Sequence, residues 1–254
     1  MTDVLVAHKP ELLARVDPGP RDIAALTDAV RAGKRIGNEN LHEDDHLNEL
    51  IPKPWGFEYR VFADDFLDVW HLSIGPGHGT STHVHPRKVT YLLCLAGEGV
   101  MNTLSGELPV SQGTAVRIGA GAFHGTRSTG TEPLHLVEVE APRNKFDLIR
   151  LRDGYNRERE GYESKHAKLN DTAPSRPVPY LPSARLRTGC PDGRFRFEIR
   201  AGMDIFYRRR EQDLFHIPLG VSGVVAGELQ ILAARREDPR RPAVDQYYLS
   251  LAEG

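Results

Sequence analysis

The sequence predicts a mainly β protein, folded as an antiparallel, jelly-roll-like barrel. Two observations carry this prediction: short apolar segments with alternating polarity recur from residue 51 to residue 140, and glycine-containing turns separate them. Because successive side chains of a strand point to opposite faces, a two-residue period indicates strands with one buried face. No amphipathic helices alternate with these segments, as they would in a parallel sheet, so an antiparallel barrel is the expected architecture.

Residues 1–50 are expected to form an N-terminal helical segment ahead of the barrel. Residues 11–16 are interpreted as a short helix that ends at the Asp17-Pro-Gly-Pro sequence, because proline and glycine terminate helices. Residues 21–33 are interpreted as a second helix, since apolar residues recur along them with the spacing of one helical face. That face would consist of Ile23, Leu26 and Val30.

A pair of histidines follows in the acidic stretch after this helix. His42 and His46 lie four residues apart, so on a helix they could both contact one zinc ion. A solvated polar face is the favoured interpretation, because no third ligand lies nearby in the sequence.

Residues 51–163 are expected to form the barrel itself. Residues 66–74 have the length and the alternation of a strand. Residues 134–140 alternate in the same way, so Glu138 and Glu140 should share one face with two leucines. We favour a solvent-exposed position for both glutamates, and access to a central pocket is the alternative.

Residues 164–254 are expected to form a connector and a β-rich C-terminal extension. Four prolines with few apolar neighbours in the connector indicate an extended segment on the surface. From Arg194 onward alternating apolar residues indicate strands again, residues 204–207 among them. The extension is short for a second barrel, so we expect it to pack on the first one or to extend its sheet.

The composition argues against several functional classes. No stretch approaches the roughly 20 apolar residues of a membrane span, and no apolar run of secretory type follows the N-terminus. Two cysteines, Cys94 and Cys190, are too few for a disulfide framework and suit a reducing cytoplasm. The net charge is −2, and acids and prolines interrupt the basic runs. We therefore expect a cytoplasmic protein with neither membrane nor nucleic acid as a partner.

Three histidines in the middle of the chain are the candidate metal ligands. His83 and His85 are two residues apart, so in a strand they point the same way, roughly 7 Å apart. Two imidazoles on one face of a curved sheet can bind a single metal ion. His124 follows a glycine-rich turn, where the backbone can bend sharply back towards a pocket. We predict that His83, His85 and His124 bind one divalent metal ion, and a barrel without metal is the alternative.

This stretch resembles the two motifs of the cupin superfamily. The matching residues are Gly77, His83, His85, Gly97, Gly113, Gly121 and His124. The chain departs from the motifs at three positions. Thr90 stands where the family usually has a glutamate ligand, Gly119 replaces a proline, and Ser128 replaces an asparagine. The resemblance implies a cupin barrel whose metal site has three neutral imidazoles plus solvent or substrate, and it leaves Fe, Zn, Ni and Mn undistinguished.

Two further segments resemble the cupins of the type II mannose-6-phosphate isomerase and mannose-1-phosphate guanylyltransferase group. Lys53-Pro-Trp-Gly-Phe-Glu resembles the segment that opens their barrel, and residues 147–157 resemble the one that closes it. The resemblance implies a homodimer and a small anionic sugar as substrate. Lys53, Arg150 and Arg157 are the candidate ligands of the anion, since ammonium and guanidinium groups bind phosphate. A surface role for the arginines stays open, and Trp55 is favoured as a packed anchor of the core.

Three functions fit these residues. The first is a metal-dependent isomerase or epimerase of a sugar phosphate or other small anionic sugar, in which a base moves a proton between neighbouring carbons. The second is a three-histidine non-haem iron dioxygenase, since three imidazoles leave positions on Fe(II) open for substrate and O2. The third is a non-catalytic sugar-binding cupin. We favour the first because of the opening and closing segments, and no catalytic base is named because Thr90 offers no carboxylate.

Overall fold

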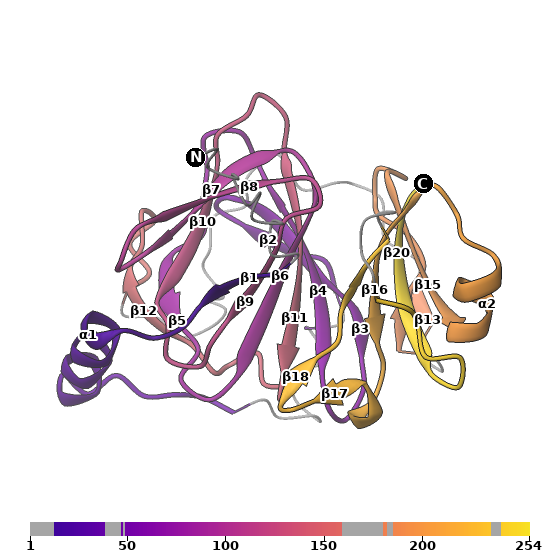
Figure 1. Cartoon of the computed structure of the whole chain (residues 1–254). Helices are drawn as coiled ribbons and strands as arrows, with labels where there is room; N and C mark the ends of the chain where they lie inside the picture. The colour runs from indigo at the N-terminus through magenta and orange to yellow at the C-terminus, as the bar shows by residue number, and fades with distance from the viewer. Residues whose placement is uncertain (1–12, 39–46, 48, 159–179, 182–184, 235–239) are drawn as a thin grey trace, which may run out of the picture.

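The computed structural model describes residues 13–38, 47, 49–158, 180–181, 185–234 and 240–254, and Figure 1 shows their arrangement. Two antiparallel sheets form the walls of a barrel, and a third sheet lies against the outside of one wall (Figure 1). The mainly β, jelly-roll-like fold expected from the sequence is confirmed.

The larger wall is a nine-stranded sheet. Its order is β1-β9-β6-β11-β4-β3-β14-β13, and β2 also pairs with β3. Its strands are β1 (Ala14–Val16), β2 (Ile51–Lys53), β3 (Gly56–Ala63), β4 (Asp68–Ile74), β6 (Val89–Ala96), β9 (Ala115–Ile118), β11 (Leu134–Ala141), β13 (Tyr180–Leu181) and β14 (Leu186–Arg187). Its strands pair antiparallel in the described chain, apart from the parallel pair β1 and β9.

The smaller wall is a five-stranded antiparallel sheet with the order β12-β5-β10-β7-β8. Its strands are β5 (Thr82–Val84), β7 (Glu98–Thr103), β8 (Glu107–Ser111), β10 (His124–Ser128) and β12 (Ile149–Arg152). Apolar side chains of both walls meet inside the barrel, with Trp70 and Leu92 from the larger wall and Met101 from the smaller one. Trp55 belongs to this cluster, so its predicted role as a packed core anchor is confirmed.

The C-terminal extension packs on the outer face of the larger wall. It contains a four-stranded sheet in the order β15-β20-β16-β19 and a two-stranded ribbon, β17 with β18. The elements are β15 (Phe195–Ala201), α2 (Gly202–Tyr207), β16 (Asp213–Pro218), the 3-10 helix η2 (Val221–Gly223), β17 (Val224–Val225), β18 (Glu228–Leu229), β19 (Leu232–Ala233) and β20 (Tyr247–Glu253). Phe195, Phe197 and Phe215 join Tyr59 and Val139 of the barrel in one apolar cluster. As a result the central strands of the larger wall are buried on both faces.

The strand predicted at residues 204–207 is wrong, because these residues lie in helix α2. The carboxylate of Asp204 accepts a hydrogen bond of 2.8 Å from Nε of Arg200, four residues earlier. The Asp204 carbonyl also accepts one from the backbone N–H of Arg208. These contacts stabilise a single helical turn that a short run of apolar residues does not reveal.

The helix predicted at residues 11–16 is also wrong where it can be described. Residues 14–16 form β1, which pairs in parallel register with Val116–Ile118 of β9. A strand edge offers unpaired N–H and C=O groups, and β1 pairs with those of β9. Six residues are too few for local propensity to outweigh this pairing.

Helix α1 (Pro20–Arg31) confirms the second predicted helix, but of the predicted apolar face Leu26 packs against the core while Ile23 and Val30 do not. Ile23 and Val30 are 61% and 54% exposed, whereas Asp22 and Ala29 are buried. The Asp22 carboxylate accepts hydrogen bonds from the backbone N–H groups of Gly19 (2.9 Å) and Phe123 (2.8 Å). Asp22 therefore caps its own helix and ties it to the turn before His124.

Some predictions concern residues that the structure does not describe. His42 and His46, and residues 164–179 of the connector, lie outside the described residues. In the part of the chain that the structure describes, no helix is both long and apolar enough to span a membrane.

Candidate metal centre and its pocket

The three predicted histidines lie together at the smaller wall of the barrel. His83 lies in β5, His85 follows that strand, and His124 begins the neighbouring β10. His124 and His83 are direct partners in the antiparallel ladder. Their ring centroids are 4.5 Å apart, and one ligand nitrogen of each of the three histidines lies within 4.8 Å of the others. The geometry therefore brings the three predicted ligands into one cluster.

Each imidazole is held by a backbone carbonyl through its Nδ1 atom. The distances are 2.8 Å from His83 to Ser81 O, 2.7 Å from His85 to Asp147 O and 3.0 Å from His124 to Ala122 O. A carbonyl can only accept, so Nδ1 carries the hydrogen in each ring and Nε2 keeps its lone pair. Nε2 of His85 and of His124 is buried and has no hydrogen-bond partner among the described residues. Carbonyl anchoring of the far nitrogen is the usual support of metal-bound histidine.

Burial also keeps these rings neutral. It holds the pKa of His83 and of His85 well below the usual range for histidine, and it lowers that of His124 to about 4. Neutral imidazole is the form that binds metal, so no proton has to leave. Three neutral nitrogen donors with unused lone pairs fit a divalent transition metal.

The two glutamates of β11 are buried, so the favoured solvent-exposed position was wrong. Glu138 is 7% exposed, Glu140 is 0% exposed, and both line the pocket beside the histidines. The smaller wall covers the face of β11 on which both glutamates lie. The sequence of β11 alone cannot show that a second sheet packs against that face. Their leucine neighbours on the same face were the available signal, because a face shared with leucines is usually an interior one.

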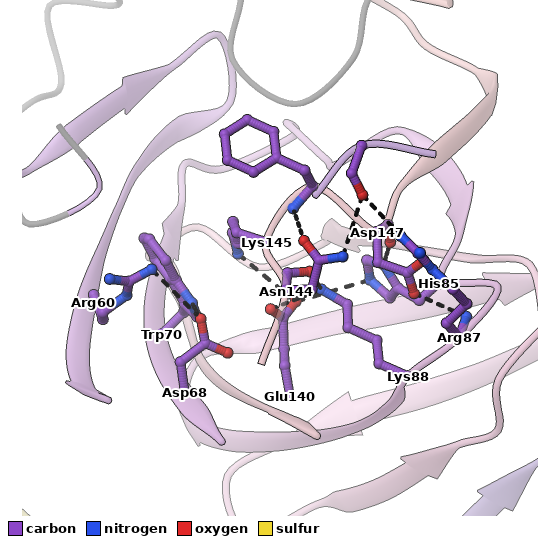
Figure 2. Close-up of polar contacts among 12 residues, drawn as sticks. Arg60, Asp68, Trp70, His85, Arg87, Lys88, Glu140, Asn144, Lys145 and Asp147 are labelled. Carbon is purple, nitrogen blue, oxygen red and sulfur yellow. Dashed lines mark hydrogen bonds and ion pairs between the residues drawn. The ribbon is translucent and has the colours of Figure 1, made fainter. Parts of the chain in front are cut away.

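Figure 2 shows the polar contacts of Glu140. Its Oε2 lies 2.8 Å from Nζ of Lys88, and its Oε1 lies 3.8 Å from Nζ of Lys145 and 4.0 Å from Nε2 of His85. Thr90, opposite Glu140 in the ladder, is fully buried.

The predicted anion-binding residues line the same pocket. Lys53, Arg150 and Arg157 are all less than 9% exposed and lie at its wall. Arg150 is the ladder partner of His83 across β12 and β5. Lys53 forms an ion pair of 3.4 Å with Glu58, and burial lowers the pKa of Lys53 to about 7. The cavity that they enclose measures about 50 Å³.

Arg157 forms an ion pair with Asp153, which lies in the same closing segment. Its Nε and Nη2 atoms donate to the two carboxylate oxygens of Asp153 at 2.8 and 2.9 Å. Burial opposes the charge of Asp153, but the Arg157 hydrogen bonds bring the pKa of Asp153 below its usual value.

Sequence reasoning missed two charged residues of the pocket, Glu58 and Lys145. Nζ of Lys145 lies 3.7 Å from Oε1 of Glu58. Burial acts against the Lys145 charge, yet Glu140, Glu58 and Glu138 together raise the pKa of Lys145. Glu58 in β3 and Lys145 in the loop after β11 come together only in the folded protein, so no local sequence pattern places them in the pocket.

Comparison with known proteins agrees with this architecture. Mannose-1-phosphate guanylyltransferase of Salmonella typhimurium is 27% identical over 139 residues, which cover 54% of this chain and 28% of that protein. The enzyme of the same name from Escherichia coli K12 is 26% identical over 139 residues, 54% of this chain and 29% of that protein. The chain thus spans less than a third of the length of these relatives.

Solved structures give weaker similarities. A Lactobacillus farciminis oxalate decarboxylase is 18% identical, covering 40% of this chain and 33% of its own, with a TM-score of 0.37. The Staphylococcus aureus capsular polysaccharide assembling protein CapF is 20% identical, covering 41% of this chain and 34% of its own, with a TM-score of 0.37. Residues 70–140 match the family described as Cupin domain. The resemblance seen in the motifs is thereby confirmed, and the segment that carries His83, His85 and His124 is a cupin domain.

Proposed function

We propose that this chain is a metal-dependent isomerase or epimerase of a small anionic sugar, with sugar phosphates as the first candidates. The observation that carries the proposal is a single pocket lined by His83 and His85 of the three-histidine cluster together with Lys53, Arg150 and Glu138. The name of the curated relatives includes a sugar phosphate, mannose 1-phosphate, which supports this substrate class.

The three histidines would hold the metal, which would polarise a substrate carbonyl as a Lewis acid. The backbone carbonyls of Ser81, Ala122 and Asp147 fix the rings in advance. Little reorganisation is then needed when the site is loaded, and a fixed arrangement of ligands favours a defined substrate pose.

Lys53 and Arg150 would bind the anionic group. Both are buried, so their bonds to an anion would be shielded from water, where charge-assisted hydrogen bonds are strongest. The Asp153 pair of Arg157 suggests a different role for that residue, because both belong to the closing segment and their ion pair stabilises its turn at the pocket wall. The small cavity favours entry of the reacting end of a sugar while its remainder lies at the mouth.

Glu138 is our candidate for the base that moves the proton. Burial raises the pKa of Glu138 to about 7, and a base works best when its pKa lies near the operating pH. Lys53 has a pKa of about 7 as well, but an approaching anion favours its charged form. We therefore assign binding to Lys53 and proton transfer to Glu138.

The test is incubation of metal-loaded protein with aldose and ketose phosphates in deuterated water, followed by mass spectrometry and NMR. Isomerase or epimerase chemistry should place deuterium on the carbon next to the carbonyl, and Glu138→Gln should abolish this exchange while metal content and substrate binding persist. Binding without exchange would contradict the proposal and leave a sugar-binding cupin.

One alternative has its own supporting observation. Thr90 brings no carboxylate to the centre, and three imidazoles alone suit a non-haem iron dioxygenase. Oxygen uptake coupled to product formation, with no solvent deuterium in the product, would favour that enzyme class over the isomerase.

A further inference from the structure

We infer that Glu140 is a fourth ligand of the metal centre and supplies from β11 the carboxylate that Thr90 does not supply from β6. The inference rests on the metal site of the proposed function and adds a ligand to it. It concerns the donor set alone, so it can be tested without a substrate.

The register of the larger wall places the two residues on the same face. Glu140 and Thr90 are direct partners in the antiparallel ladder of β11 and β6. Directly opposite residues of such a ladder project to the same side, with Cβ atoms roughly 4.5–5.5 Å apart. Both are 0% exposed, and Thr90 Oγ1 has no hydrogen-bond partner within the described chain. A carboxylate at position 140 therefore lies in the same part of the barrel interior as a carboxylate at position 90 would.

The contacts of Glu140 direct one oxygen towards the histidines. Oε2 lies 2.8 Å from Nζ of Lys88, which also donates to the backbone carbonyl of Asn144 at 3.0 Å. Oε1 lies 4.0 Å from Nε2 of His85, and neither atom has a hydrogen-bond partner among the residues described (Figure 2). Two donors of one tetrahedral zinc ion lie roughly 3.4 Å apart. Glu140 lies outside the group of mutually close ligand atoms that the three histidines form, so its side chain would turn slightly towards His85 when the ion binds.

The charges around the site favour the same assignment. Three neutral imidazoles bring no negative charge, whereas Lys88 and Lys145 lie at the same carboxylate. A buried divalent cation close to two ammonium groups is unfavourable unless an anion binds it directly. Among the carboxylates that line the pocket, Glu140 approaches a ligand histidine to 4.0 Å, so it is the group placed to do so.

The competing explanation is that Glu140 serves solely as the counter-ion of Lys88 and Lys145. In that case its loss would lower the stability of the fold and leave the metal ligands unchanged. Glu138→Gln is the matched control, because it replaces a carboxyl group with an amide on the same strand, the same face and in the same pocket.

The first measurement is the affinity for Mn2+ of wild type, Glu140→Gln and Glu138→Gln, each shown to be folded by thermal melting. We expect Glu140→Gln to weaken Mn2+ binding by about 100-fold or more, because loss of a residue that only supports a ligand costs up to about 100-fold. Glu138→Gln should change the affinity only a few-fold. The double variant Thr90→Glu/Glu140→Gln should regain most of the loss, since it returns a carboxylate to the same face.

The second measurement is electron–nuclear double resonance of the Mn2+-loaded proteins, made with glutamate labelled with 13C at the side-chain carboxyl. A 13C coupling of a bound carboxylate should be present in wild type and Glu138→Gln and absent in Glu140→Gln. No such coupling in wild type, or equal affinities for the two single variants, would overturn the assignment. Metal binding that persists in His83→Ala would instead refute the histidine site itself, so the two failures are distinguishable.

Discussion

Lys53 gives the sharpest stability prediction. Burial lowers its pKa from 10.5 to about 7, against the opposing effect of Glu58, and Lys145 and Arg150 lower it further. Between these two values the unfolded chain binds a proton at this lysine that the folded chain does not. The free energy of unfolding therefore rises with pH between about 7 and 10.5. Below about pH 7 the folded protein also carries the charged lysine, so it bears the full cost of burying that charge.

Replacing Lys53 with methionine removes this titration. One pKa unit corresponds to about 1.4 kcal/mol, so wild type should gain about 3 kcal/mol relative to Lys53→Met between pH 7.5 and pH 9.5. The stability of wild type relative to the variant should be lowest at pH 7 and below, where the charged ammonium is buried at full cost.

Urea unfolding of the metal-free proteins at three pH values in this window measures the difference. Titrating groups that do not interact with Lys53 are common to both proteins, so they cancel in the difference between the two free energies of unfolding. Parallel stability curves would refute the reasoning and show that Lys53 stays charged in the folded protein.

Three more predictions follow from the fold and the site. His83→Ala should reduce the metal content of purified protein to near zero while the circular dichroism spectrum is retained, and equal stoichiometric metal in that variant would contradict the site. Gly97→Ala should destabilise the fold by about 1–3 kcal/mol in urea, because φ at Gly97 is +87° and an added Cβ would lie 2.6 Å from Pro133 O. Gly193→Ala, with φ of +73° but nothing within 4 Å of the added atom, is its control and should cost less. Light scattering at micromolar concentration should give a homodimer, and a clean monomer would remove that expectation alone.

The barrel and the three histidines were predictable because their signals are local. A two-residue period fixes which side chains share a face, and the His83 to His85 spacing is such a signal. The carbonyls that hold the rings were not predictable, since Asp147 O reaches His85 from a segment 62 residues away.

Burial of Glu138 and Glu140 could not be settled from their strand alone. Alternation separates the two faces of β11, but whether a face meets solvent or another sheet depends on residues elsewhere in the chain. The same holds for residues 14–16, whose strand exists because β9 offers it an edge. Non-local pairing decided each of these positions.

The sheet that covers the outside of the larger wall changes what a partner can use. Aromatic side chains of β15 and β16 cover the surface on which Tyr59 and Val139 lie, so residues of the same chain already bury that surface. A second copy of the chain would have to associate through a different part of the molecule. Removing residues 194–254 would uncover a broad apolar surface, and the shortened barrel would tend to recruit another barrel to cover it.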